Sequence, residues 1–207
     1  MDKKTFIIAE AGDNHNGDIS LAYKLIDVAK QSGADAVKFQ TFVTEEIICR
    51  NAEMAEYQKK NTGIEESQFD MVKKLELSFE QFKELKKYCD KVGIKFMTTA
   101  FDIKSIKFVV NDLKLDILKI PSGEITNYPY LVETAKSGKD IILSTGMATI
   151  EEINDAINVL RQNGSGKISI LHCTTEYPAP LDSINLNAIK TLQQEFNCDV
   201  GYSDHTK

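Results

Sequence analysis

The sequence is poor in cysteine: the 207 residues include four, at Cys49, Cys89, Cys173 and Cys198. They form no CxxC pair, and their density is far below that of a small domain crosslinked by disulfides. A chain of this length buries a core large enough to fold without such crosslinks. We therefore expect reduced thiols, as in a cytoplasmic protein.

Long apolar stretches are also missing. The N-terminus passes from the charged residues 1–4 directly into the strand-like segment Phe6–Ala11. It has neither the apolar core nor the small-residue cleavage site of a signal peptide. These features predict a cytoplasmic protein without a membrane span or a membrane partner.

Basic residues do not outnumber acidic ones. The chain has 25 Lys and Arg against 31 Asp and Glu, which gives a formal net charge of −6. Binding to a phosphate backbone requires a basic surface, so nucleic acid is excluded as the main partner. An anionic substrate would instead need a local cationic pocket. Linkers, repeats and low-complexity tracts are absent too, and we expect a single domain over residues 1–207.

Short segments rich in β-forming residues alternate with helical patterns along the chain. There are about seven: Phe6–Ala11, Ala36–Phe42, Lys95–Ala100, Ile117–Pro121, Asp140–Thr145, Ile168–Cys173 and Val200–Tyr202. Such alternation is typical of an α/β fold with a parallel sheet and right-handed crossovers. Polar residues end nearly every strand instead of gathering at one switch point. This favours a closed (β/α)8 TIM-type barrel, with about seven of eight strands present, over an open doubly wound sheet.

Helix signals lie between many of these strands. The capping-box patterns SFEQ and TIEE, and proline at a tolerated first-turn position, mark three of the starts. The predicted helices are Asp18–Ser32, one from Ser78 to Gly93, one from Pro129 to Gly138, one from Thr149 to Asn163, and Asn185–Glu195. Residues 43–69 are polar and aperiodic, which predicts an active-site loop or lid.

The carboxyl ends of barrel strands converge on one mouth, so polar residues far apart in the sequence become neighbours there. Lys38 and Gln40 share a face of their strand because side chains alternate with period two. The other strand-end residues are Glu10, Thr98, Thr99, Lys119, Ser122, Glu124, Ser144, Thr145, His172, Thr174, Thr175, Tyr177, Ser203, Asp204 and His205.

Two lysines among several hydroxyls suit a phosphorylated, carboxylated anion such as phosphoenolpyruvate, because ammonium groups neutralise its charge and hydroxyls orient it. A carboxylate at Glu10 or Glu124 is an acid–base candidate. His205 offers a neutral imidazole that can bind a transition metal, and such a metal would polarise an aldehyde for carbon–carbon bond formation.

Each of these residues also has a structural interpretation. Lys38 and Lys119 could be ion-paired supports of the barrel. His15 could simply satisfy backbone groups in its asparagine-rich turn, and His172, from mid-strand, is better interpreted as a packed core residue. Serine and threonine also fill turns and caps. The convergence of the whole set, rather than any single residue, favours function.

Seven motifs resemble those of the sialic acid synthase family, with its legionaminic and pseudaminic acid relatives. In order they are IAEAGDNHNGD, GADAVKFQTF, KLELSFEQF, LKIPSGEITNYP, ILSTGMATIEEI, LHCTTEYPAP and GYSDHT, and they extend across essentially the whole chain. The segments EYQKKNTG and ESQFDM are more similar to the N-acetylneuraminate and legionaminate branches than to the pseudaminate branch.

The resemblance implies a cytoplasmic transferase that joins phosphoenolpyruvate to an N-acylated amino sugar, either N-acetylmannosamine or a diacetamido hexose. The products would be phosphate and a nonulosonic acid for cell-surface polysaccharide. In this reaction C3 of phosphoenolpyruvate attacks the sugar aldehyde, water adds at C2, and phosphate leaves with C–O cleavage. A divalent metal is implied as well, with Mn²⁺ expected and Mg²⁺ or Co²⁺ as alternatives.

The same resemblance assigns roles to individual residues. Glu10, Glu124 and Lys119 fall on catalytic positions, and His205 falls on a metal-ligand position. Substrate-binding positions hold Lys38, Gln40, Thr99, Ser122, Ser144, Thr175, Tyr177 and Ser203. Thr175 stands where some members have asparagine.

The sequence ends at Lys207, directly after SDHT. Family members continue through an eighth strand, with a second metal histidine, into a small antifreeze-like domain. That domain supplies an arginine to the sugar site of the partner in a homodimer. We therefore expect these 207 residues alone to have little or no synthase activity, and a full-length parent to be an active homodimer.

Two other functions remain open. Lys119 or Lys38 could attack a carbonyl, which would make the protein a Schiff-base aldolase that borohydride traps with pyruvate. Alternatively, the chain could be a non-catalytic barrel fragment that binds phosphoenolpyruvate or a partner subunit without forming product.

Overall fold

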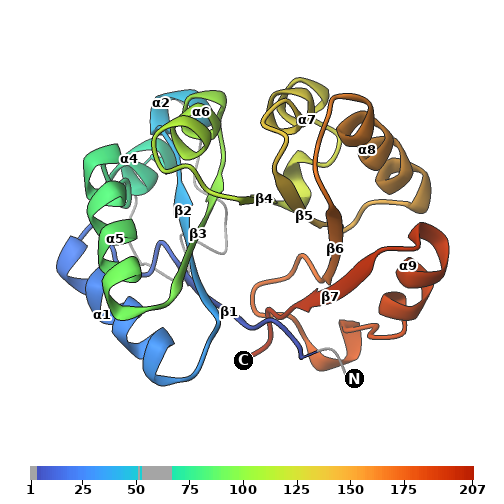
Figure 1. The fold of residues 1–207 in the computed structure, drawn as a ribbon, viewed down its shortest axis with the longest axis horizontal. Helices are drawn as coiled ribbons and strands as arrows, with labels where there is room; N and C mark the ends of the chain where they lie inside the picture. Colours follow the sequence, from blue (N-terminus) through green and yellow to red (C-terminus); the bar gives the residue numbers. More distant parts are fainter. Residues whose placement is uncertain (1–3, 51, 53–66) are drawn as a thin grey trace. The chain divides into compact units, whose positions relative to one another are not determined.

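The computed structural model describes residues 4–50, 52 and 67–207. The chain divides into two compact units, Met1–Lys114 (unit 1) and Leu115–Lys207 (unit 2). Both are built from parallel strands alternating with helices (Figure 1), which confirms the predicted α/β class and the seven predicted strands. Within the described ranges, no helix has the length and apolar character needed to cross a membrane.

Unit 1 contains a parallel sheet in which β1 pairs with β2 and β2 with β3. Helices α1 and α5 pack against each other and against these strands, as Figure 1 also shows. Phe39 and Phe96 stack in its core, with 5.8 Å between ring centroids. The elements are β1 (Ile8–Gly12), α1 (Ile19–Gln31), β2 (Ala36–Thr41), α2 (Thr44–Ile47), α4 (Gln68–Lys73), α5 (Phe79–Val92), β3 (Lys95–Ala100) and α6 (Ile103–Asn111).

Unit 2 contains four parallel strands in the order β4, β5, β6, β7. Helix α7 packs against α8, and α9 lies against β6 and β7. Leu143, Leu160 and Ile170 are fully buried in its core. The elements are β4 (Ile117–Ile120), η1 (Ser122–Glu124), α7 (Tyr128–Ala135), β5 (Asp140–Ser144), α8 (Ile150–Gln162), β6 (Ile168–Cys173), η2 (Leu181–Ser183), α9 (Ala188–Phe196) and β7 (Asp199–Ser203).

Both predicted capping boxes are present. Ser78 Oγ accepts the Gln81 N–H at 3.2 Å, and the Gln81 side chain accepts the Ser78 N–H at 2.8 Å. Thr149 and Glu152 form the same reciprocal pair at 3.2 and 2.8 Å. Each box satisfies amide groups that have no partner inside the helix. The starts of α5 and α8 therefore follow from four local residues in each case.

A helix also lies between the third and fourth strands, where the sequence patterns named none. Helix α6 occupies this segment and begins after Asp102, whose carboxylate accepts the Ser105 N–H at 2.8 Å. Its buried side chains include Ile106 and Val109, three residues apart on one face.

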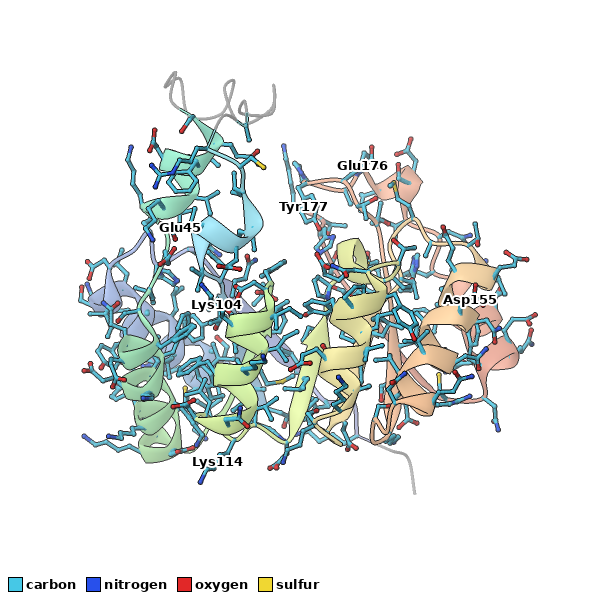
Figure 2. All side chains as sticks on the ribbon, turned by 90° about the horizontal axis from the view of Figure 1, so that it is seen from above. Glu45, Lys104, Lys114, Asp155, Glu176 and Tyr177 are labelled. Atoms are coloured by element: carbon cyan, nitrogen blue, oxygen red, sulfur yellow. The ribbon has the colours of Figure 1, made fainter. Side chains whose placement is uncertain are left out.

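The prediction of a loop at residues 43–69 is wrong at the two ends that the structure describes, because α2 and the first residues of α4 are helical. Figure 2 shows Glu45 on α2 and Lys104 at the start of α6 at one end of unit 1, opposite Lys114. The end with Glu45 is the one at which the parallel strands terminate. Residues 51 and 53–66 of the predicted loop lie outside the described residues.

Candidate functional site

A carboxylate–ammonium pair joins the first two strands of unit 1. Glu10 lies opposite Lys38 in the parallel register, and Lys38 Nζ forms an ion pair with Glu10 Oε2. The Lys38 side chain is 13% exposed and that of Glu10 is 50% exposed. Lys38 is thus ion-paired, but the half-exposed carboxylate leaves the pair accessible to a ligand.

Gly12 brings the loop after β1 close to this pair. A Cβ atom at position 12 would lie 3.4 Å from Glu10 Oε1, 3.6 Å from Gln40 Nε2 and 3.8 Å from Asn14 Nδ2. Gln40 therefore lies on the same side of β2 as Lys38, as the period-two pattern predicts. Asn14 is an additional polar neighbour of Glu10 that the sequence patterns did not single out.

Thr99 belongs to this group, whereas Thr98 does not. Thr99 lies opposite Gln40 in the register between β2 and β3 and is 3% exposed. Thr98 forms a buried hydrogen bond with Thr41, with 2.7 Å between the two Oγ1 atoms. The expectation that Thr98 is a strand-end site residue is wrong, because adjacent strand residues point to opposite faces.

Lys119 is a buried cation of unit 2. It is 7% exposed, and its ammonium donates to Ser144 Oγ at 2.7 Å and to the Ile120 carbonyl at 2.8 Å. These two acceptors are uncharged oxygens, and they orient the ammonium. An ammonium can form strong, charge-assisted hydrogen bonds with an anionic ligand.

Ser122 and Thr175 come together at Gly146. A Cβ atom at position 146 would lie 2.6 Å from both Cβ and Oγ of Ser122 and 3.0 Å from Thr175 Cγ2, and the φ angle of Gly146 is +53°. Glycine alone combines this φ with so close an approach at little cost. The sequence patterns identified the two hydroxyl residues but missed this role of Gly146. A glycine directly after the strand-end pair Ser144-Thr145 would have indicated it.

Glu124 lies in η1, two residues after Ser122. Its Oε2 accepts a hydrogen bond from Asn127 Nδ2 at 2.6 Å, and Asn127 also caps α7 by accepting the Tyr130 N–H at 3.2 Å. The cap of α7 therefore orients the Glu124 carboxylate, which is partly exposed.

Tyr177 and His205 form a further contact in unit 2, with 4.4 Å between their ring centroids. Tyr177 is 65% exposed on the segment after β6, where Figure 2 labels it. His205 Nδ1 lies 2.6 Å from the Thr174 carbonyl, and because a carbonyl only accepts, Nδ1 is the donor. Ser203, the last residue of β7, lies opposite Cys173 in the register with β6.

His205 has the features of one metal ligand. With Nδ1 protonated, Nε2 carries the lone pair that a metal would accept. Metal-binding histidines commonly donate their other ring N–H to a backbone carbonyl, which fixes the orientation of the ring. Across residues 4–50, 52 and 67–207, however, no group of three or more His, Cys, Asp or Glu side chains is arranged to hold an ion. The described residues therefore supply a single candidate ligand and not a complete metal site.

His172 is a partly buried residue of β6. It lines a cavity of about 360 Å³ together with the strand-end residues Thr145 and Gly146, Ile153 of α8 and Leu192 of α9. Its Nε2 is buried with no hydrogen-bond partner among the described residues, and burial lowers the pKa of the imidazole. His172 therefore lies against α8 and α9 and also borders the strand-end residues Thr145 and Gly146.

The sequence prediction thus yields two groups, one in each unit. Unit 1 holds Glu10, Lys38, Gln40 and Thr99; unit 2 holds Lys119, Ser122, Glu124, Ser144, Thr175, Tyr177, Ser203 and His205. Their convergence at a single barrel mouth stays a prediction.

Comparisons with known proteins identify similar chains. The N,N'-diacetyllegionaminic acid synthases of Campylobacter jejuni subsp. jejuni and Legionella pneumophila subsp. pneumophila are 55% and 48% identical, over 99% and 97% of this chain. The crystal structure of N-acetylneuraminic acid (sialic acid) synthetase from Leptospira borgpetersenii, in complex with citrate, is similar with a TM-score of 0.85 and 35% identity over 99% of this chain. That likeness confirms the predicted fold class.

The chain spans 62% and 57% of the lengths of the two legionaminic acid synthases and 66% of the solved synthetase. The model of the NeuB family matches residues 25–207, which is most of the chain. On this match, the chain belongs to the NeuB family.

Proposed function

We propose that the protein takes part in the condensation of phosphoenolpyruvate with an N-acylated amino sugar, which gives a nonulosonic acid and phosphate. The observation that carries this proposal is the buried Lys119 ammonium, held by Ser144 Oγ at 2.7 Å. Membership of the NeuB family supports it, as do relatives named for synthesis of legionaminic and sialic acids.

Unit 2 has the chemistry that phosphoenolpyruvate requires. The phosphate and carboxylate of this substrate need a cation and hydroxyl donors, which Lys119, Ser122 and Ser144 supply. We assign Thr175, Tyr177 and Ser203 to the surroundings of this substrate, and Glu124 to an acid–base role there. The single positive charge of Lys119 would also stabilise the phosphate as it leaves.

Unit 1 has the chemistry that the sugar requires. We assign Glu10 to acid–base work at the sugar, with Lys38 and Gln40 as binding residues and Thr99 beside Gln40. In the condensation, C3 of phosphoenolpyruvate bonds to the aldehyde carbon, and the aldehyde oxygen takes up a proton. A water oxygen then bonds to C2, and the C2–O bond to phosphate breaks.

A divalent metal at His205 is part of the proposal, with Mn²⁺ first and Mg²⁺ or Co²⁺ as alternatives. Such an ion would polarise the aldehyde. We also propose cytoplasmic localisation, a homodimeric whole protein, and a product that enters cell-surface polysaccharide.

Phosphate release tests the proposal. The assay compares the 207-residue chain with the same chain joined to the part of the Campylobacter relative that lies beyond the match, because the chain spans 62% of that relative. Each form receives phosphoenolpyruvate, Mn²⁺ or EDTA, and either a 2,4-diacetamido hexose or N-acetylmannosamine. The diacetamido sugar comes first, since the relatives at 55% and 48% identity are both legionaminic acid synthases.

We expect the joined form to release phosphate with one sugar, to need the metal, and to lose the activity in a Lys119→Met variant. The 207-residue chain alone is expected to show little activity. No phosphate release by the joined form with either sugar would refute the proposal. Trapping of pyruvate by borohydride would then favour the aldolase, and phosphoenolpyruvate binding without product would favour the non-catalytic barrel.

A further inference from the structure

His15 lies at the centre of the loop that follows β1. Three residues with positive φ lie in this loop and at its junction with β1, namely Gly12 at the end of the strand and Asn16 and Gly17 in the loop. His15 is 1% exposed, so it is one of the most deeply buried polar side chains of unit 1. A loop built from so many left-handed residues is not held by regular secondary structure and needs specific contacts.

The His15 residue provides two of these contacts. Its ring Nδ1 accepts the Gly17 N–H at 3.1 Å, and its backbone carbonyl accepts the Asp18 N–H at 2.8 Å. Asp18 in turn caps α1 by accepting the Ser20 N–H at 2.7 Å. His15 therefore ties the end of the loop to the start of α1.

The ring has a defined protonation state. Burial lowers the pKa of His15, although the nearby Asp13 carboxylate raises it, so the imidazole is neutral near pH 7. Because Nδ1 accepts a hydrogen bond, the proton of the neutral ring is on Nε2. That Nε2 is buried without a hydrogen-bond partner among the described residues.

The two ends of the loop have little freedom. At Gly17 an added Cβ would collide with the Lys74 carbonyl, so the backbone packs directly on the segment after α4. At the other end, Gly12 and Asn14 lie beside Glu10 and Gln40. A displacement of the backbone at Gly17 would therefore be transmitted along the loop to Asn14 and Gly12, which lie beside Glu10.

We propose that His15 is a positioning residue that fixes Asn14 and Gly12 against Glu10, through its hydrogen bond from the Gly17 N–H. The inference rests on the proposed function, in which Glu10 acts at the sugar. His15 itself contacts no substrate in this assignment. Its loss should therefore affect the sugar step and leave phosphoenolpyruvate binding by unit 2 nearly unchanged.

Two variants separate the acceptor from the bulk of the ring. Asparagine in H15N keeps an acceptor oxygen close to the position of Nδ1, whereas leucine in H15L fills similar space without an acceptor. H15A removes the ring without adding bulk and replaces H15L if that variant does not fold. H172L is the matched control, because His172 is also a histidine with a buried, unpartnered Nε2 but lies in unit 2.

The first readout is amide hydrogen exchange at Asn14 and Gly17, which does not depend on activity. We expect H15L to lose protection at both amides, H15N to keep it, and H172L to leave it unchanged. The second readout is kinetics of the joined form. We expect H15L to lower kcat by about tenfold or more with KM for phosphoenolpyruvate within about twofold, and H15N to recover most of kcat.

Unchanged exchange in H15L, or lost protection with an unchanged kcat, would overturn the role of His15. A joined form that is inactive with every sugar would refute the proposed function instead. In that case the exchange pattern still decides whether His15 holds the loop, so the two failures are distinguishable.

Discussion

The Lys119 ammonium on β4 lies 2.7 Å from the Ser144 hydroxyl on β5, and the two strands are neighbours in a parallel pair. This contact places a positive charge at the carboxyl end of the pair. A carboxylate at position 144 would neutralise that charge, whereas a hydroxyl only orients it. Ser144 is therefore suited to present Lys119 to an anion rather than to neutralise it.

Ser144→Ala should weaken phosphoenolpyruvate binding. Hydrogen bonds to charged groups contribute about 1.5–3 kcal/mol, so KM for phosphoenolpyruvate should rise by roughly 10- to 150-fold in the joined form. Steady-state kinetics measures this change. Ser169→Ala, near the start of β6, is the matched control and should leave KM unaltered. Equal KM values for the two variants would contradict the role of Ser144.

Gly146→Ala should have a larger effect on unit 2 than the positive φ angle of residue 146 alone would cause. Both Gly146 and Gly164 have positive φ, at +53° and +93°, but a Cβ at Gly164 would meet no atom within 4 Å. Each alanine should lower the free energy of unfolding by about 1–2 kcal/mol for the left-handed conformation. Only Gly146→Ala should also displace Ser122 and reduce phosphoenolpyruvate binding.

Urea unfolding and phosphoenolpyruvate titration distinguish these two effects. Gly164→Ala is expected to lose stability with its affinity intact. If Gly146→Ala binds phosphoenolpyruvate as tightly as Gly164→Ala does, the close contact with Ser122 has no role in the site.

Local features were predictable from the sequence. The SFEQ and TIEE patterns gave the starts of α5 and α8, because all the donors and acceptors of a capping box lie within four residues. The alternation of side chains correctly put Lys38 and Gln40 together. Applied to the next strand, the same rule would have shown that only one of Thr98 and Thr99 can face the site, although not which one. The Asp102 cap with Ile106 and Val109 would have indicated α6.

Contacts between distant segments were not predictable in this way. The ion pair of Glu10 with Lys38 depends on the register between β1 and β2, which hydrophobic patterns do not set to the residue. The close approach of Gly146 to Ser122 depends on two strand-end loops meeting. Their residues were identifiable as candidates, but their mutual geometry comes only from the folded chain.

The four cysteines should differ in reactivity. Cys49 is exposed, whereas Cys89 is buried, and burial raises the pKa of the Cys89 thiol to about 12. Since the thiolate is the reactive form, a thiol reagent at about pH 8 should modify Cys49 rapidly in the native protein. Cys89 and Cys173 should react only after unfolding. Cys198 is partly exposed, and burial raises its pKa, so it should react more slowly than Cys49. Cys49→Ser should remove the rapid phase, and a rapid phase of unchanged amplitude in this variant would contradict the exposure of Cys49.

The stability of the protein should fall as the pH is lowered through the range of histidine titration. Burial lowers the pKa of both His15 and His172 below the ordinary value of 6.5. The unfolded chain therefore binds protons at a higher pH than the folded one, and stability rises with pH wherever the unfolded state binds more protons. As the pH falls through 6.5 the free energy of unfolding should decrease, and well above 6.5 these two groups should contribute no slope.

His172→Asn should reduce this slope, because it removes one of the two titrating groups. Urea unfolding of both proteins at several pH values from about 5 to 7.5 measures it. Leu192→Ala is the control: it lines the same cavity as His172 and should lower stability at every pH without changing the slope. An identical slope in His172→Asn and the unaltered protein would mean that His172 titrates alike in the folded and unfolded chains, and would contradict the lowering of the His172 pKa by burial.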